Sequence, residues 1–346
     1  MGDKERIVRS NAAKALGTLG DKRAIPFLLE ALLDETDSVK EAVAEVLGIL
    51  GDKNAVIPLI NTLKATHNKQ VKIKTIKALG ELKAEKAIHE IIRYLNDKDK
   101  DIKEIATEAL GKVGDVQAIP FMIEALFDEV DSIREIAAQV LGTLKDKRAV
   151  IYLIKALQDS SWIVRQNAAV SLGIIGSKQA TDPLIKLVLN DDNWSVRWKA
   201  CQALGMLKDK KAQTPLIKAL DDKDWHVRKS AAEALGELGD KDTVKPLINK
   251  LEDKERFVRE AARKALVKIG NPSLTDLILA LEHDNKYVRK EAALALGELK
   301  DKIAISALLK KLNDKYWSVR KAASDALINI GEPSILPLIT IIESIN

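Results

Sequence analysis

The chain of 346 residues is poor in cysteine, in aromatic residues and in long apolar runs. Its one cysteine, Cys201, cannot form an internal disulfide, which fits a reducing compartment. Aromatic residues make up only 4% of the chain, while Ala, Leu, Ile, Lys and Glu abound, and this composition favours helices over sheets. No segment is apolar enough to be a secretion signal or a membrane span. We therefore expect a soluble, cytoplasmic, helical protein.

The chain also lacks a strong excess of charge of one sign. Its 56 basic and 51 acidic residues leave a net charge of only +5. Proteins that bind nucleic acids through the phosphates have a denser basic surface. The charge balance therefore argues against DNA or RNA as a partner.

A repeat of about 31 residues runs through the whole chain. In each repeat a branched apolar residue, called here the anchor, is followed by Lys or Arg, and a Leu stands eight residues later. Further apolar residues follow the anchor at helical spacing and form one face of an α-helix. We expect a single array over residues 1–346, with these eleven anchors: Val8, Val39, Val71, Ile102, Ile133, Val164, Val196, Val227, Val258, Val288 and Val319.

A second apolar stretch follows each Gly-Asp or Lys-Asp turn. Residues 24–29 are an example, with Pro26 in the first turn, where the missing N–H of proline costs nothing. Each repeat is therefore predicted to be a pair of helices. A pair this short cannot bury its own apolar face, so neighbouring repeats must stack into one continuous core.

Glycine occupies two positions of the repeat. Nine of the 17 glycines, such as Gly205 and Gly236, stand nine residues after an anchor, inside the helix, where we expect neighbouring helices to approach closely. Seven more, such as Gly239, are predicted to close the anchor helix as its C-terminal cap. Only Gly2 remains, so no glycine is left for a loop that binds phosphate.

The pattern Val-Arg-x-x-Ala-Ala-x-Ala-Leu-Gly-x-Leu-Gly-Asp is clearest at Val227–Asp240. It resembles the short HEAT repeat of the phycobilisome-lyase type over the whole chain, and also the consensus of designed helical-repeat scaffolds. This resemblance implies an all-α fold, a right-handed α-solenoid (alpha-alpha superhelix) of about eleven HEAT-like helix pairs. It says little about function, because one fold supports many functions.

The basic residue after the anchor has a predicted partner. An Asp stands five residues before the anchor in most repeats, as Asp191 and Asp222 do. The HEAT resemblance implies that such Asp and Arg residues form a ladder of hydrogen-bonded pairs between adjacent repeats. We therefore interpret the basic residues as structural and not as a stripe that binds nucleic acid.

Metal and thiol chemistry have little support. The four histidines fall in four different repeats. Deoxyhypusine hydroxylases have this type of repeat and hold di-iron with several His-Glu pairs, of which only His89-Glu90 is matched here. Cys201 stands where other repeats have Ala, so we expect a small buried side chain. No metal and no cofactor are predicted.

The positions that the repeat leaves free form a line two residues before the anchor and two, six and ten after it. In HEAT solenoids that this chain resembles, such positions line the concave surface. In the first half of the chain the line is acidic, which repels phosphates and favours partners with basic segments. The acidic flank comprises Asp37, Glu41, Glu45, Glu104, Glu108, Asp131 and Glu135.

Repeats six to eight carry four of the five tryptophans on or beside this line. Large aromatic residues at exposed positions, with amides between them, predict a contact surface. The alternative is that a Trp in the turn between helices packs over the next repeat, as Trp317 could do. The predicted binding residues are Trp162, Gln166, Asn167, Val170, Trp194, Trp198, Gln202, Met206, Trp225 and His226.

The sequence thus predicts a scaffold that binds a protein or peptide and not an enzyme. Phycobilin lyases resemble this repeat and handle a tetrapyrrole, which an aromatic groove could hold. Two further alternatives are an oxidoreductase like deoxyhypusine hydroxylase and a DNA glycosylase built on HEAT-like helices. The glycosylase requires a basic concave face, which the acidic line contradicts.

Overall fold

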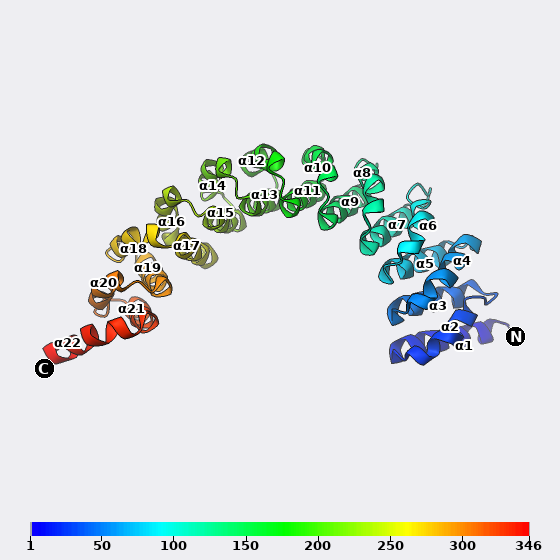
Figure 1. The fold of residues 1–346 in the computed structure, drawn as a ribbon, viewed down its shortest axis with the longest axis horizontal. Helices are drawn as coiled ribbons and strands as arrows, with labels where there is room; N and C mark the ends of the chain where they lie inside the picture. The colour runs from blue at the N-terminus through cyan, green and yellow to red at the C-terminus, as the bar shows by residue number, and fades with distance from the viewer. Residues whose placement is uncertain (1, 346) are drawn as a thin grey trace. The chain divides into compact units, whose positions relative to one another are not determined.

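The computed structural model describes residues 2–345, which fold into 22 α-helices joined by short turns, with no strand among them. Two compact units make up the chain, Met1–Ile175 and Gly176–Asn346, and we call them the N-terminal and C-terminal units. Each unit is a stack of helix pairs (Figure 1). The all-α solenoid fold is confirmed, while the right-handed coiling of the array and its continuity as one domain stay predictions.

In the N-terminal unit, the odd-numbered helices contain the anchors and the even-numbered helices are shorter. The odd-numbered helices are α1 (Gly2–Leu19), α3 (Asp37–Leu50), α5 (Lys69–Glu81), α7 (Lys100–Val113), α9 (Asp131–Leu144) and α11 (Trp162–Ile175). The even-numbered helices are α2 (Ile25–Ala31), α4 (Val56–Ala65), α6 (Ile88–Ile92), α8 (Ile119–Ala125) and α10 (Val150–Ala156).

The C-terminal unit repeats the same order. Its odd-numbered helices are α13 (Trp194–Leu207), α15 (Trp225–Leu238), α17 (Arg256–Ile269), α19 (Lys286–Leu299) and α21 (Trp317–Ile330). Its even-numbered helices are α12 (Thr181–Asn190), α14 (Gln213–Ala219), α16 (Val244–Asn249), α18 (Leu274–Ala280), α20 (Ile305–Lys311) and α22 (Ile335–Ile345).

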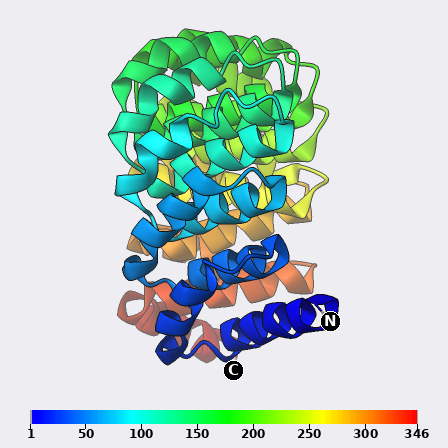
Figure 2. The ribbon, with the colours of Figure 1, turned by 90° about the vertical axis from the view of Figure 1, so that its right-hand side faces the viewer.

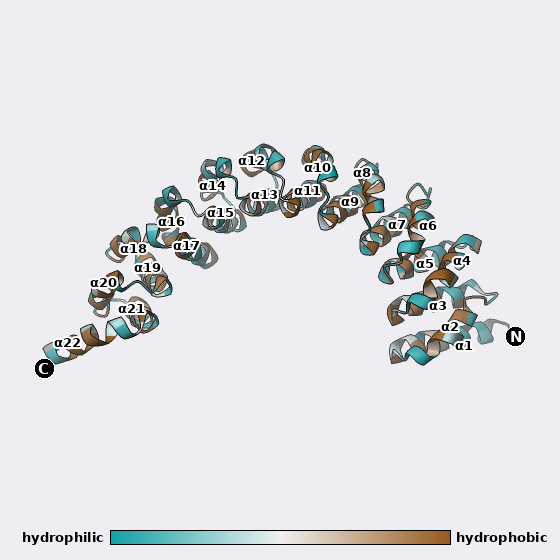
Figure 3. Ribbon diagram, viewed as in Figure 1, coloured by the Kyte–Doolittle hydropathy of each residue, from teal (hydrophilic) through white to brown (hydrophobic). Residues whose placement is uncertain are grey.

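Within each unit the odd-numbered helices form one layer and the even-numbered helices the other (Figures 1 and 2). The odd-numbered layer lies on the inner side of the curve of each unit (Figure 1). Helices carry both hydrophobic and hydrophilic residues, as amphipathic helices packed on one side do (Figure 3). The core lies between the layers, and every anchor from Val39 to Val319 is buried there, whereas Val8 is exposed.

The turn before each even-numbered helix is set by its aspartate. Asp209, for example, accepts a hydrogen bond from the main-chain N–H of Lys211 and thereby caps a 3₁₀ turn, Lys210–Ala212, that leads into α14. Short polar side chains favour this local bond over helix continuation. This explains why the Gly-Asp and Lys-Asp pairs mark the break between the two helices of a repeat.

The predicted close approach at the helical glycines is confirmed. A Cβ added at Gly205 would lie 3.0 Å from Cα of Ala234, and one at Gly236 would lie 2.8 Å from Cα of Ala265. Neighbouring odd-numbered helices therefore touch backbone to backbone, which a larger side chain would prevent. The predicted capping glycines are confirmed as well; Gly239, for instance, ends α15 with φ of +67°.

Candidate binding face

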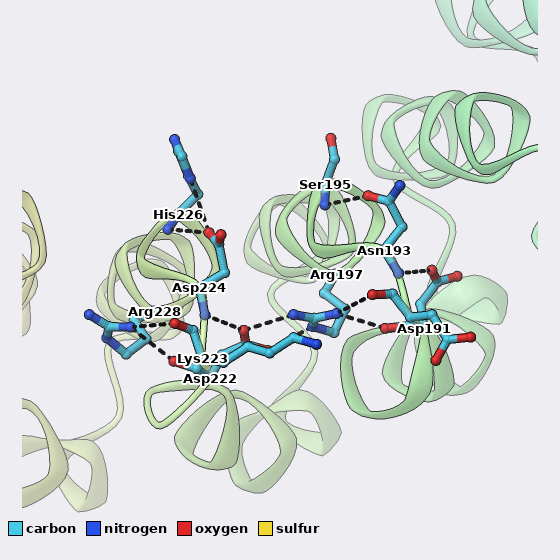
Figure 4. Close-up of polar contacts among 10 residues, drawn as sticks. Asp191, Asn193, Ser195, Arg197, Asp222, Lys223, Asp224, His226 and Arg228 are labelled. Atoms are coloured by element: carbon cyan, nitrogen blue, oxygen red, sulfur yellow. Dashed lines mark hydrogen bonds and ion pairs between the residues drawn. The ribbon is translucent and has the colours of Figure 1, made fainter.

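Adjacent repeats are tied together by the predicted arginine–aspartate ladder. Arg197 donates from Nε and Nη2 to the carboxylate of Asp222, one repeat further on, at 2.7 and 2.9 Å. Its Nη1 donates to the main-chain carbonyls of Asp191 and Asp192 in its own repeat (Figure 4). The same set of bonds joins three other pairs: Arg134 with Asp159, Arg228 with Asp253 and Arg289 with Asp314.

The carboxylate and the guanidinium of a ladder pair both stay ionised. Burial acts to raise the pKa of Asp222, but hydrogen bonds from Arg197 and from the N–H of Asp224 outweigh it, so the pKa lies below its ordinary value. The hydrogen bond to Asp222 in turn raises the pKa of Arg197. The side chain of Arg197 is only 6% exposed. Such arginines are therefore bound within the fold and do not form a free basic stripe.

Aromatic side chains from three consecutive repeats form a continuous row in the C-terminal unit. Trp198 stacks on Trp194 with ring centroids 6.0 Å apart, and Trp194 stacks on His226 at 4.6 Å. His226 stacks on Trp225 at 3.7 Å, and Trp225 stacks on Phe257 at 5.4 Å. We call these five residues the aromatic row. It crosses from α13 over α15 to α17, and its rings lie too close together for another ring to enter between them.

The row is partly open to solvent. Phe257 is 54% exposed and Trp194 is 39% exposed, while the other three rings are half-buried. Among the described residues, no acceptor is hydrogen-bonded to the indole N–H of Trp194, Trp198 or Trp225. Indole N–H groups that are taken out of water normally find an acceptor. The row thus combines apolar area with donors that remain available to a partner.

His226 is held in the row by the start of its own helix. Asp224 precedes α15 and its Oδ1 accepts from the main-chain N–H of His226 at 2.8 Å. The same carboxylate oxygen lies 3.0 Å from Nδ1 of the imidazole (Figure 4). The helix cap therefore also fixes the ring between the indoles of Trp194 and Trp225.

A groove of about 490 Å³ lies between α13 and α15. Gln202 and Met206 line it from α13, and Ser230 and Glu233 line it from α15. Met206 is 54% exposed. The hydroxyl of Ser230 is buried and has no hydrogen-bond partner among the described residues. The groove offers a thioether, an amide and a carboxylate to a bound chain.

Lys199 completes this region. Its Nζ lies 3.9 Å from the ring centroid of Trp198 and donates to Oε1 of Gln202 at 3.1 Å. Burial lowers the pKa of Lys199. Lys199 and Phe257 were missed by the sequence analysis, which considered the line at four-residue spacing. Phe257 stands one residue before its anchor, as His226 does. A search for aromatic residues at the position before each anchor would therefore have found Phe257.

Four of the five tryptophans stand at helix starts and not in the turns. Trp162, Trp194, Trp225 and Trp317 are each the first residue of their α-helix. Trp225 does pack over the next repeat, through Phe257, as the alternative interpretation expected. Trp317 is 67% exposed and has Lys321 over its ring.

The predicted residues of repeat six lie on α11 in the N-terminal unit. Trp162 is 43% exposed there, and Gln166, Asn167 and Val170 are half-buried. The remaining six predicted residues, Trp194, Trp198, Gln202, Met206, Trp225 and His226, lie on α13 and α15 in the C-terminal unit. That these two groups serve one site stays a prediction.

The acidic flank lies on α3, α7 and α9, and all seven of its side chains are at least partly exposed. Lysines interrupt it, because Glu45 pairs with Lys74 at 2.7 Å and Glu108 pairs with Lys112 at 2.7 Å. Burial, helped by the neighbouring Asp37, raises the pKa of Glu41. The flank is thus a mixed surface of carboxylates and lysines and not a continuous negative stripe.

Other candidate chemistry is placed as follows. Cys201 is fully buried, as predicted, and burial raises its thiol pKa far above the ordinary range. His89 is exposed, and its neighbour Glu90 lies within ion-pair distance of Lys64 and Arg93. No three His, Cys, Asp or Glu side chains gather as a metal site within residues 2–345.

None of the described helices has the length and apolar character needed to cross a membrane.

Comparison with known families agrees with the repeat geometry. The sequence matches the family model for HEAT repeats over residues 1–72, 56–142, 128–205, 181–267, 214–281 and 274–343. The chain belongs to the HEAT-repeat family. No curated protein matches the sequence of this HEAT-repeat chain.

Solved structures share its fold. Kap95p, from a study of its binding to RanGDP, is 14% identical with a TM-score of 0.62, over 97% of this chain and 55% of its own. The Escherichia coli protein YibA is 24% identical with a TM-score of 0.53, over 78% and 97%. The CpcE–CpcF complex of phycocyanin lyase from Nostoc sp. PCC7120 is 27% identical over 66% and 94%. Its TM-score of 0.42 is too low to support an inference about activity.

Proposed function

We propose that this HEAT-repeat chain is a non-enzymatic scaffold that binds a protein or peptide along the face of its odd-numbered helices. The aromatic row is the observation that carries the proposal. Equivalent positions to Trp198 hold Ser10, Glu41, Glu104 and Lys229, so the repeat itself does not require an indole there. Half-exposed aromatic rings with available donors are typical anchors of protein interfaces.

The groove beside the row suits an extended peptide. A peptide in an extended or polyproline conformation leaves its carbonyls without internal hydrogen bonds, and indole N–H groups and the Gln202 amide are donors for them. The thioether of Met206 adapts to apolar side chains of different shape. The carboxylates of the acidic flank that have no ion-pair partner within residues 2–345 favour basic segments elsewhere in the same partner.

Catalysis has weaker support. The thiol of Cys201 is buried and protonated at neutral pH, which removes it as a nucleophile. A visible absorption band in the purified protein would instead favour the tetrapyrrole-handling alternative.

Selection of peptides on the full chain tests the proposal. A random twelve-residue library displayed on phage is panned against the wild-type chain and the Trp198→Ala chain in parallel. We expect peptides that bind the wild type and bind Trp198→Ala about 30- to 900-fold more weakly, as the loss of a central aromatic anchor predicts. Because Trp198 also stacks on Trp194 and lies at a tilt against His226, a small fall in melting temperature is expected too.

Trp317→Ala is the matched control, since Trp317 is 67% exposed and forms no ring stack with another aromatic residue among the described residues. Its peptide affinity should equal that of the wild type. A large fall in the melting temperature of Trp198→Ala with unchanged peptide affinity would make Trp198 a packing residue and remove it from the site.

A further inference from the structure

The ladder has one gap inside the C-terminal unit. Arg259, in α17, has His283 at the place where the other ladder arginines have an aspartate. Arg259 keeps the two bonds of Nη1, to the carbonyls of Asp253 and Lys254 at 2.6 and 3.1 Å. Its Nε, which in the other rungs donates to the carboxylate, is buried and has no acceptor among the described residues.

A ladder aspartate accepts a hydrogen bond from the main chain of its own turn and also binds the arginine, and His283 does only the first. Its Nδ1 accepts from the main-chain N–H of Asn285 at 3.0 Å, as the carboxylate of Asp222 accepts from the N–H of Asp224 at 2.8 Å. A neutral imidazole that accepts at Nδ1 carries its proton on Nε2 and has no second acceptor. The turn is therefore preserved, but the guanidinium edge of Arg259 is left without its anion.

An aromatic ring and a lysine lie beside the gap. The ring of Tyr287 lies 4.5 Å from Cζ of Arg259, over the face of the guanidinium, and Lys286 lies 5.2 Å from the same ring. Lys286 has no carboxylate within ion-pair distance among the described residues. Burying a charged donor without an acceptor is unfavourable, and the stacked ring compensates only in part.

We propose that Arg259 binds a carboxylate of the partner, an Asp or Glu side chain that takes the place of the missing ladder aspartate. The site lies on α17, two residues after Phe257, the last residue of the aromatic row. A guanidinium can stack its face on an aromatic ring while its edge binds a carboxylate with two parallel bonds, so Tyr287 can remain in place. This inference rests on the proposed function for its partner and defines one residue that the bound segment must carry.

His283→Asp tests the site by supplying the carboxylate from the chain itself. The probe is N-acetylglutamate amide, and the readout is the NMR signal of the Arg259 Nε–H in the full chain, assigned with Arg259→Lys. We expect a saturable shift with a dissociation constant in the millimolar range for the wild type. In His283→Asp the binding should be about 10- to 100-fold weaker and the melting temperature higher, because the rung is complete.

His283→Ser is the matched control, since a serine hydroxyl can accept from the N–H of Asn285 but brings no charge. It should bind the probe as the wild type does. No saturable shift in the wild type, or the same shift in His283→Asp, would overturn the proposal. Binding of inorganic phosphate with no binding of N-acetylglutamate amide would overturn the assignment to a carboxylate.

The two proposals fail separately. A single amino-acid probe does not need the aromatic row, so its binding should be unchanged in Trp198→Ala. If selection on the wild-type chain yields no binding peptide while the probe still binds, the scaffold proposal alone is rejected.

Discussion

The two units present different surfaces on the same frame. In the N-terminal unit the free positions of the odd-numbered helices carry carboxylates and lysines, many of them paired, as Glu45 and Lys74 are. The C-terminal unit carries the aromatic row at corresponding positions. Yet the arginine pairs of the ladder have the same geometry in both, with Nε to Oδ2 distances of 2.8 Å for Arg134 and 2.7 Å for Arg197, although lysines take the arginine position in α3, α5 and α7. Anchors, glycines and ladder thus keep the repeat spacing, while the surface positions vary and set the partner.

The largest expected effect comes from breaking the ladder in either unit. Arg197→Ala and Arg134→Ala should each lower the free energy of unfolding by about 3 kcal/mol, because each leaves a poorly exposed carboxylate without its partner. Urea unfolding and hydrogen exchange of the adjacent helices measure this. Arg148→Ala, which removes an exposed arginine paired within its own turn, should cost less than about 0.5 kcal/mol. Unchanged stability of Arg197→Ala together with lost peptide binding would make the basic residues functional.

Replacing a glycine by alanine where two helices touch should have the next largest effect on stability, again in both units. Gly236→Ala places Cβ 2.8 Å from Cα of Ala265, and Gly48→Ala places it 2.9 Å from Cα of Ala78. We expect each to destabilise by about 1 to 3 kcal/mol, although Ala is the better helix former. Thermal unfolding provides the measurement. A gain in stability would show that the helices can move apart freely.

Acid should weaken both units in the same pH range. Hydrogen bonds from Arg9 and Thr36 outweigh burial and lower the pKa of Asp34 to about 2, and the pKa of Asp222 is also lowered. A lowered pKa means that the stabilisation is complete above the unfolded value, about 3.9, and is lost as the pH falls through the folded value. Urea midpoints should therefore fall between pH 4 and pH 2. Asp222→Asn should show a weaker dependence on pH, and an equal dependence would exclude the ladder as its source.

The smallest expected effect is at the helix ends that lack a capping glycine. Lys300 follows α19 with φ of +55°, and Lys145 follows α9 with φ of +54°. Replacing either by glycine relieves the left-handed conformation but adds freedom to the unfolded chain, so we expect a net gain of about 0.5 kcal/mol in each unit. Differential scanning calorimetry would detect it. Destabilisation by Lys300→Gly would mean that its side chain makes contacts that outweigh the strain.

The fold was predictable because it depends on the spacing of apolar residues and on small residues at the contacts between helices. Apolar spacing fixed the helix pairs, and the glycine at Gly205 indicated a contact between helices that the structure shows at 3.0 Å. The ladder was expected from the family resemblance, and its partner for Arg197 proved to be Asp222 in the next repeat.

The surface was less predictable, because it depends on which way side chains turn. The sequence period does not predict that Trp194 and Trp225 enclose His226, or that Lys74 forms an ion pair with Glu45 from a neighbouring helix. The gap at Arg259 is visible in the sequence as a histidine in place of an aspartate. Only the three-dimensional structure shows that its Nε has no acceptor among the described residues.

An arginine binds carbonyls of its own repeat and a carboxylate of the next at the junctions of Arg134, Arg197, Arg228 and Arg289, so these junctions have the same set of donors and acceptors. A whole repeat can therefore be duplicated or deleted, and the new neighbours will still match. An insertion of a few residues would instead carry an aspartate away from its arginine and break one rung. Changes in chain length should thus be tolerated in steps of one repeat, which allows such a gene to grow or shrink by unequal recombination while the remaining repeats keep their structure.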